Sequence, residues 1–318
     1  MEHIAVKVER KRREAQGIAS FELARVDGAA LPAFSAGSHI DVQVPGGPTR
    51  QYSLCNDSGE RHRYRIAVLR DTASRGGSTG MHDAVNEGDV IHISEPRNHF
   101  ALVHAKRTLL FAGGIGVTPL LCMAQRLWAI GADFTLHYCT RSKERTAFLQ
   151  EIADSGFRDN VRFHFDDAGA SQILNVPAEL GTLDPDTHLY ICGPAGFINH
   201  VLQIAQGMGW PAAQIHLEYF TAAAQDHSAD GAFQVKLAST GKTYEVASDQ
   251  TVVQALQANG VDILTSCEQG VCGTCITRVL EGEPEHRDLY FTAEEKAAND
   301  QFTPCCSRSR SKVLVLDL

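Results

Sequence analysis

Four cysteines in the last third of the chain have a spacing suited to binding iron. Four residues separate Cys267 from Cys272, two separate Cys272 from Cys275, and 29 separate Cys275 from Cys305. A C-x4-C-x2-C run with a distant fourth cysteine is the ligand pattern of plant-type 2Fe–2S clusters, in which four thiolates hold two tetrahedral irons. We therefore predict a 2Fe–2S cluster bound by these four residues.

Glycines in the same loop support this prediction. Gly270 and Gly273 permit the unusual backbone angles that are needed to wrap a loop around a cluster and turn its amides inward. A structural zinc site is the main alternative, although it favours short cysteine spacings on both sides. Disulfides are disfavoured, because nine cysteines without a secretory signal indicate a reducing compartment. Cys306 is an alternative to Cys305 as the fourth ligand.

A glycine-rich turn in the middle of the chain could bind a nucleotide. Residues 113–119 read G-G-I-G-V-T-P between an apolar strand and a helical run. Backbone amides at such a turn approach a pyrophosphate, and the helix N-terminus favours negative charge. We expect Thr118 to be the N-cap and Pro119 the first helical residue. The run departs from G-x-G-x-x-G, so a purely structural turn is the alternative. Residues 192–194 (C-G-P) end another expected parallel strand and point to the same crevice.

Two segments of the N-terminal third have the chemistry of a flavin site. Arg50 and Tyr52 share one face of an expected strand, with Ser53 on the other face or at its edge. An arginine suits a phosphate, and a tyrosine ring suits stacking on a planar heterocycle. Residues 75–80 (R-G-G-S-T-G) form a loop whose amides and hydroxyls could hold a phosphate. Taken singly, each segment is equally typical of packing or of an ordinary turn.

The surrounding pattern predicts three domains. Short β-like runs separated by turns indicate an antiparallel β-barrel over residues 1–104. Alternating strands and helices indicate an α/β domain with a parallel sheet over 105–225. Residues 221–230 are small and polar and resemble a linker, and the order of elements over 226–318 suits a β-grasp, ferredoxin-like domain.

Composition narrows the function classes. The chain has 318 residues, 43% of them hydrophobic, which is ample for several cores. Its net charge of −9 leaves no broad basic field for nucleic acid. The charged N-terminus does not read as a signal peptide, and the most apolar run, 109–124, is broken by glycines, so we expect no membrane span. We expect a cytoplasmic protein.

The motifs taken together resemble one family. Their order, R-x-Y-S, G-G-S, G-G-x-G-x-T-P, C-G-P and then C-x4-C-x2-C…C, is similar to that of the phthalate dioxygenase reductase and vanillate demethylase reductase family, across essentially the whole chain. The resemblance implies an oxidoreductase that passes electrons from NADH through FMN and a 2Fe–2S cluster to a terminal Rieske-type oxygenase.

The resemblance also implies residue roles. Ser53 and Cys192 would be catalytic, beside the flavin and the nicotinamide. The metal ligands would be Cys267, Cys272, Cys275 and Cys305. The cofactor-binding residues would be Arg50, Gln51, Tyr52, Ser53, Ala67, Val68, Arg75, Gly76, Gly77 and Ser78 for FMN, Gly114, Gly116, Thr118 and Cys192 for NADH, and Phe220 against the flavin.

The sequence leaves alternatives for the flavin, the nucleotide and the function. The sequence alone does not separate FMN from FAD. Arg141 and Lys143 follow a strand where an acidic residue would bind the ribose of NADH, so they could accept the 2′-phosphate of NADPH. A free-standing flavin reductase with a dead-end cluster is one alternative function, and a zinc-stabilised interaction module is another.

Overall fold

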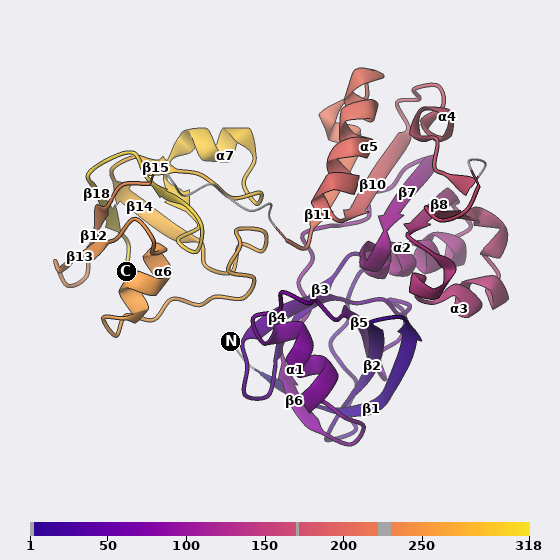
Figure 1. The fold of residues 1–318 in the computed structure, drawn as a ribbon, viewed down its shortest axis with the longest axis horizontal. Coiled ribbons are helices and arrows are strands. Elements are labelled where there is room, and N and C mark those ends of the chain that lie inside the picture. Colours follow the sequence, from indigo (N-terminus) through magenta and orange to yellow (C-terminus); the bar gives the residue numbers. More distant parts are fainter. Residues whose placement is uncertain (1–2, 170–171, 222–229) are drawn as a thin grey trace. The chain divides into compact units, whose positions relative to one another are not determined.

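The chain folds into two compact units. The computed structural model describes residues 3–169, 172–221 and 230–318 and divides the chain into Met1–Phe220 and Thr221–Leu318 (Figure 1). Most of the segment expected to be a linker, residues 222–229, lies outside the described residues.

The first unit begins with a six-stranded antiparallel sheet in the order β4-β3-β6-β1-β2-β5. The two edge strands, β4 and β5, lie against each other, so the sheet curls into a barrel. Apolar residues fill its interior, with Phe21, Ile40 and Ile66 among the fully buried side chains. The strands are β1 (Ile4–Ala15), β2 (Ile18–Arg25), β3 (His39–Gln43), β4 (Thr49–Ser53), β5 (Tyr64–Leu69) and β6 (Val90–Ile93), and the helix α1 (Gly77–Ala84) lies between β5 and β6.

A five-stranded parallel sheet in the order β11-β10-β7-β8-β9 follows in the same unit. Alternate residues of β7 point to opposite sides of the sheet, so both faces present apolar side chains, and helices pack on both of them. Leu110 packs with the side chains of α2, whereas Leu109 packs with those of α4 and α5. The strands are β7 (Arg107–Gly113), β8 (Asp133–Thr140), β9 (Val161–Phe165), β10 (Thr187–Gly193) and β11 (Ile215–Tyr219). The α-helices are α2 (Val117–Ala129), α3 (Leu149–Asp154), α4 (Val176–Leu180) and α5 (Ala195–Gly207).

An ion pair joins the barrel to the parallel-sheet domain. Arg65 of β5 donates two hydrogen bonds, each of 2.7 Å, to the carboxylate of Glu151 on α3. The Arg65 side chain is 9% exposed, and its guanidinium lies 4.9 Å from the centre of the Phe148 ring. Two parallel hydrogen bonds from an enclosed arginine fix orientation as well as distance. The barrel and the parallel sheet therefore form one body.

The second unit is a mixed sheet in the order β13-β12-β18-β14-β16, in which β12 and β18 are parallel. Its strands are β12 (Phe233–Leu237), β13 (Thr243–Val246), β14 (Thr277–Glu281), β16 (Gln301–Phe302) and β18 (Val313–Leu316). The short strands β15 (Pro284–Glu285) and β17 (Arg308–Ser309) pair separately. The helix α6 (Val252–Gln257) packs Val252 and Leu256 into the core of this unit, and α7 (Ala293–Ala298) follows β15. The fold class expected from the sequence, a barrel, a parallel α/β sheet and a β-grasp domain, is confirmed.

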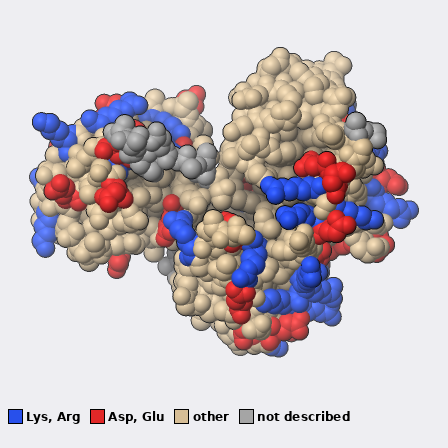
Figure 2. Space-filling view, in the orientation of Figure 1, with Lys and Arg blue, Asp and Glu red and all other residues tan. Residues whose placement is uncertain are grey.

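The surface carries both acidic and basic side chains, as expected from a sequence with 29 Lys and Arg and 38 Asp and Glu residues. Figure 2 shows acidic and basic side chains interspersed over the visible face, whereas the part of that face over α5 is free of charged side chains. None of the helices in the described ranges combines the length and the apolar character needed to cross a membrane.

Candidate functional site

The predicted iron ligands lie close together at the cysteine loop of the second unit. The Cys267 side chain contacts those of Cys272 and Cys305, and Cys305 also contacts Cys275. The four side chains therefore form one connected group, in which Cys305 also contacts its neighbour Cys306. Among the described residues, no three His, Cys, Asp or Glu side chains are grouped around a single ion position. A two-iron cluster needs only two cysteines on each iron.

Backbone amides of the loop point at the cysteine sulfurs. The Gln269 amide donates to the Cys267 sulfur over 3.3 Å, and the Thr274 amide donates to the Cys272 sulfur over 3.4 Å. Gly270 and Gly273 are both left-handed, with φ of 71° and 70°, which turns the chain inward at these two points. Hydrogen bonds to thiolate sulfurs stabilise an electron-rich cluster and tune its potential. The residues present therefore fit a 2Fe–2S cluster.

Cys306 differs from its neighbour Cys305. Cys305 is buried, whereas Cys306 is partly exposed, lies 3.2 Å from the Thr303 hydroxyl and stands over Gly270. A Cβ atom added to Gly270 would fall 2.3 Å from the Cys306 sulfur. Cys305 contacts both Cys267 and Cys275, whereas Cys306 contacts Cys305, Thr303 and Ser307, and this difference favours Cys305 as the fourth ligand.

In the first unit, three polar groups from two different sheets converge. Ser53 ends β4 of the barrel, whereas Cys192 and Glu218 lie side by side on β10 and β11 of the parallel sheet. The Ser53 hydroxyl donates to Glu218 Oε2 over 3.5 Å, and the Cys192 thiol donates to the same oxygen over 3.9 Å. The structure thus brings together the two residues expected to be catalytic and adds Glu218 between them.

Glu218 was not among the predicted site residues. The residue as a whole is partly exposed, but its carboxyl group lies deep in the protein, and burial raises its pKa from 4.5 to about 8. Burial also raises the pKa of the Cys192 thiol well above its usual range. Burial therefore favours the protonated, uncharged form of both groups beside Ser53.

The glycine-rich turn begins with a single 3₁₀ turn, η1 (Gly114–Gly116), that winds directly into α2. The expected cap is wrong in this detail. Gly116 is the N-cap, and Thr118 is already inside the helix, where its hydroxyl donates to the Ile115 carbonyl over 3.0 Å. The 3₁₀ turn supplies the first helical turn, so no side-chain cap is needed at Thr118.

The glycines of this turn serve different purposes. A Cβ atom on Gly116 would lie 2.3 Å from the Cys192 carbonyl oxygen, so this glycine lets α2 pack against β10. A Cβ atom on Gly114 would meet nothing within 4 Å, and its φ is 55°. Gly114 therefore presents open backbone at the carboxyl end of the sheet, where nucleotides bind in such folds.

The predicted phosphate-binding residues form a cradle at the start of α1. Gly76 is the N-cap with φ of 90°, and no side chain caps the helix. The side chain of Arg50 passes so close to Gly77 that a Cβ atom there would lie 2.8 Å from Arg50 Cγ. Ser78 accepts a hydrogen bond from the Asp71 amide, which closes the loop. A guanidinium beside a helix N-terminus suits a phosphate dianion.

The remaining predicted flavin residues lie on the two strands that meet at the barrel edge. The Gln51 side-chain nitrogen is buried without a hydrogen-bond partner among the described residues, as expected of a group that faces a ligand. Burial raises the pKa of the half-buried Tyr52 phenol. On β5, Ala67 is buried, and the Val68 carbonyl already accepts from the His82 ring over 2.9 Å. The chemistry of these strands fits a flavin.

The two remaining predicted residues are Arg75 and Phe220. Arg75 is exposed in the loop that precedes α1. Phe220 directly follows β11 and packs against the core that includes Cys192.

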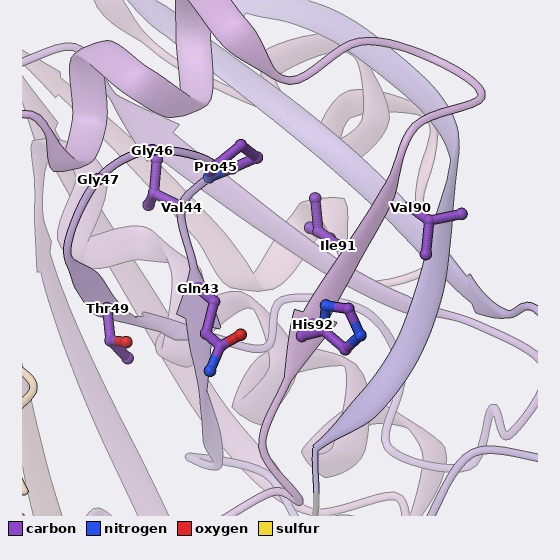
Figure 3. Close-up of a pocket in the computed structure, with 9 residues that line it drawn as sticks. All are labelled: Gln43, Val44, Pro45, Gly46, Gly47, Thr49, Val90, Ile91 and His92. Atoms are coloured by element: carbon purple, nitrogen blue, oxygen red, sulfur yellow. The ribbon is translucent and has the colours of Figure 1, made fainter.

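Two open hollows in the described part of the chain lie away from these groups. The first, of about 440 Å³, lies on the barrel beside the β3–β4 turn and β6 (Figure 3). Its polar groups are those of Gln43, Thr49 and His92 together with the backbone, and it has no charged side chain to bind a phosphate. The second, of about 670 Å³, lies beside the end of α2 and includes Phe34, Leu102 and Ile130. The predicted flavin and nucleotide residues line neither hollow.

Comparison with known proteins agrees with this geometry. Residues 235–310 match the family described as the 2Fe-2S iron-sulfur cluster binding domain. Vanillate O-demethylase oxidoreductase of Pseudomonas putida is 55% identical over 307 residues, which are 96% of each chain. Phthalate dioxygenase reductase of Burkholderia cepacia is 39% identical over 317 residues, 99% of this chain and 97% of the relative.

A solved structure of phthalate dioxygenase reductase, described as modular for electron transfer from pyridine nucleotides to 2Fe–2S, is also similar. It has a TM-score of 0.78 at 39% identity and covers 99% of this chain and 98% of its own. The fold and the two sites thus define a modular reductase, an oxidoreductase in which a flavin and nucleotide unit is joined to an iron–sulfur unit. The chain belongs to the oxygenase-reductase family that includes the vanillate O-demethylase oxidoreductases and phthalate dioxygenase reductase.

Proposed function

We propose that this protein is the reductase component of a two-component Rieske-type oxygenase. It oxidises NADH and passes electrons through FMN and a 2Fe–2S cluster to the terminal oxygenase. The observation that carries this proposal is the presence, in one chain, of a cysteine loop with inward amides and a nucleotide sheet whose Cys192 and Glu218 meet Ser53 of the barrel.

The first unit would perform the two-electron half of the reaction. When bound, the flavin accepts the electron pair of a hydride and releases the electrons singly. The chain's own contribution is positioning, since hydride transfer needs no protein acid or base. Arg50 and the start of α1 would hold the phosphate, and Tyr52 would lie along the ring. The neutral Glu218 carboxyl keeps a proton within reach of the Ser53 hydroxyl, 3.5 Å away.

The second unit would perform the one-electron half. When bound, the cluster carries single electrons. Cys267, Cys272, Cys275 and Cys305 would together hold the two irons. Amides of the loop hold the sulfurs in place, and Gly270 and Gly273 keep the loop tightly turned.

The proposed partner is the oxygenase that demethylates vanillate. Two relatives at 55% and 53% identity are both named vanillate O-demethylase oxidoreductase, and they match this chain over almost its full length. An oxygenase that acts on phthalate is the second choice, on the strength of the relative at 39% identity. We expect neither nucleic acid nor a membrane as a partner, and we place the reaction in the cytoplasm.

We further propose that the functional domains are residues 1–104 for FMN, 105–225 for NADH and 226–318 for the cluster. Up to Phe220, where the first compact unit ends, the first two lie in one unit that the ion pair between Arg65 and Glu151 helps to hold together. This grouping suits the proposed reaction, because the nicotinamide must stack on the flavin while the cluster receives electrons over a distance.

An anaerobic titration with NADH tests the proposal. We expect the flavin absorbance to bleach and the cluster to become reduced, with its characteristic electron paramagnetic resonance signal, in protein without a partner. A flavin that is reduced while the cluster stays oxidised would refute the internal relay. Zinc in place of iron in the purified protein would refute the cluster itself.

A cysteine variant separates the relay from a dead-end cluster. Cys272→Ser should still oxidise NADH with an artificial dye but should lose electron delivery to the oxygenase. Undiminished vanillate turnover by Cys272→Ser would show that the cluster is not on the path. Cys122→Ser, which changes a fully buried thiol of the first unit, is the matched control.

A further inference from the structure

A buried carboxylate stands against the cysteine loop, and the function described above does not use it. Asp288 belongs to the segment His286–Arg287–Asp288 that follows β15, and its side chain is 0% exposed. A carboxylate enclosed in a small domain is costly unless cations and hydrogen-bond donors surround it. Its partners therefore indicate what it does.

The carboxylate of Asp288 organises the residues that follow it. Its Oδ2 accepts hydrogen bonds from the amides of Tyr290 over 3.1 Å and Phe291 over 2.8 Å. Lys296 of α7 places its ammonium 3.6 Å from the same oxygen and also donates to the Asp288 carbonyl over 2.6 Å. The segment 288–291 and the start of α7 are thus tied to this one side chain.

The same segment forms a wall of the cysteine loop. The Leu289 amide donates to the Gly270 carbonyl over 3.0 Å. A Cβ atom on Gly270 would lie 3.0 Å from Asp288 Cα and 3.1 Å from its Cβ. Gly270 lies between Cys267 and Cys272, so the position of Asp288 limits where this part of the loop can lie.

The other side of the carboxylate lacks hydrogen bonds. Asp288 Oδ1 and both ring nitrogens of His286 are buried without a hydrogen-bond partner among the described residues. The His286 ring and the Asp288 carboxylate are 3.5 Å apart, measured from His286 Nδ1 to Asp288 Oδ1. Lys296 is therefore the cation that chiefly offsets the Asp288 charge; the carboxylate is fully enclosed, whereas the Lys296 side chain is 31% exposed and partly screened by solvent.

We propose that Asp288 is a positioning residue for the cluster, and that the Asp288–Lys296 pair sets the cluster's reduction potential. The carboxylate holds Leu289 against Gly270 and so maintains the loop whose amides face the cysteine sulfurs. Its charge opposes addition of an electron to the cluster, and the charge of Lys296 favours it, because net charge and hydrogen bonds near a cluster set its potential. This inference rests on the proposed assignment of the four cysteines as cluster ligands.

The test compares Asp288→Asn with Lys296→Gln in the full-length holoprotein. Asn keeps an oxygen that accepts the two amide bonds, so the loop should stay formed while the negative charge is lost. We expect Asp288→Asn to raise the midpoint potential of the cluster and Lys296→Gln to lower it. Each shift should change the ratio of reduced to oxidised cluster at a fixed potential by about tenfold, or ~59 mV for one electron. The measurements are a spectroelectrochemical titration and the iron content.

Matched controls are Asp317→Asn and Lys236→Gln, which remove the same charges from exposed positions on the sheet of the same unit. Asp288→Ala removes both the charge and the acceptor and should lose iron during gel filtration, whereas Asp288→Asn should retain it. The proposal is overturned if the two principal variants shift the potential in the same direction, if they match the controls, or if Asp288→Ala keeps its iron and the wild-type potential. Failure of the proposed function is a separate outcome, since it would be seen in the wild-type protein as the absence of a 2Fe–2S cluster.

Discussion

Replacing Glu218 with glutamine should change how the first unit responds to pH. The folded-state pKa of this carboxyl is about 8, compared with 4.5 when it is solvated. Because the folded pKa is raised, the stability associated with Glu218 is fully present below pH 4.5. It is lost as the pH rises through 8, at about 1.4 kcal/mol per pH unit between the two values. Glutamine does not titrate and escapes this loss.

The size of the effect follows from the two pKa values. Between pH 6 and pH 9 the wild-type protein should lose roughly 3 kcal/mol more stability than Glu218→Gln. For a unit of this size, that difference corresponds to roughly 6–12 °C in melting temperature. The two proteins share every other titrating residue, and the Cys192 thiol is the one whose raised pKa depends partly on Glu218.

Release of flavin fluorescence during heating follows this unit within the full chain. Melting curves at pH 6 and pH 9 for the two proteins give the difference directly. If the melting temperatures of the two proteins depend equally on pH, the claim that the Glu218 carboxyl is enclosed and has a raised pKa is refuted. A larger pH dependence in Glu218→Gln would give the opposite sign and refute it as well.

Three further changes test other parts of the site. Cys305→Ser should abolish the cluster absorbance and at least halve the iron content, whereas Cys306→Ser should leave both unchanged; the reverse pattern would reassign the fourth ligand. Gly116→Ala should destabilise the first unit by about 1–3 kcal/mol, seen by calorimetry, because its methyl group would collide with the backbone of β10. Gly196→Ala, at a helical position with nothing within 4 Å, should cost nothing, and equal effects at the two glycines would contradict this reasoning. Arg141→Ala should weaken oxidation of NADPH about tenfold and leave the KM for NADH within about twofold, since the loss of one charged contact to a 2′-phosphate is worth about 1.4 kcal/mol; a parallel loss with both nucleotides would exclude this specificity role.

Local sequence patterns were sufficient where one short segment determines the outcome. The cysteine loop was predictable because three of its four ligands and its two left-handed glycines lie within nine residues, Cys267 to Cys275. Strands such as β9 (Val161–Phe165) and β18 (Val313–Leu316) belong to the same class, because each is a short apolar run between turns. Family resemblance supplied what these patterns alone did not specify, namely the choice of flavin and of nucleotide.

Features that depend on tertiary packing were missed. In sequence, Glu218 is one acid in a five-residue strand, which is typical of an exposed position. Only the pairing of β11 with β10, and the approach of β4, enclose its carboxyl. Thr118 has the residue type of a cap, yet the preceding 3₁₀ turn takes that place. The helix α7 was missed because it has six residues and no buried face, although its capping box, Thr292 with Glu295, was a signal available in the sequence.

The bidentate pair between Arg65 and Glu151 has a consequence for engineering. A chimaera that takes its nucleotide-binding half from another reductase must also bring a carboxylate to the position of Glu151, or supply a new partner for an arginine that is 9% exposed. Without one, the guanidinium would stay enclosed without its counter-ion, and the two halves would lose the contact that fixes their mutual orientation. Exchange of the cofactor preference is therefore better attempted by point substitutions in the loop after β8 than by grafting the whole sheet.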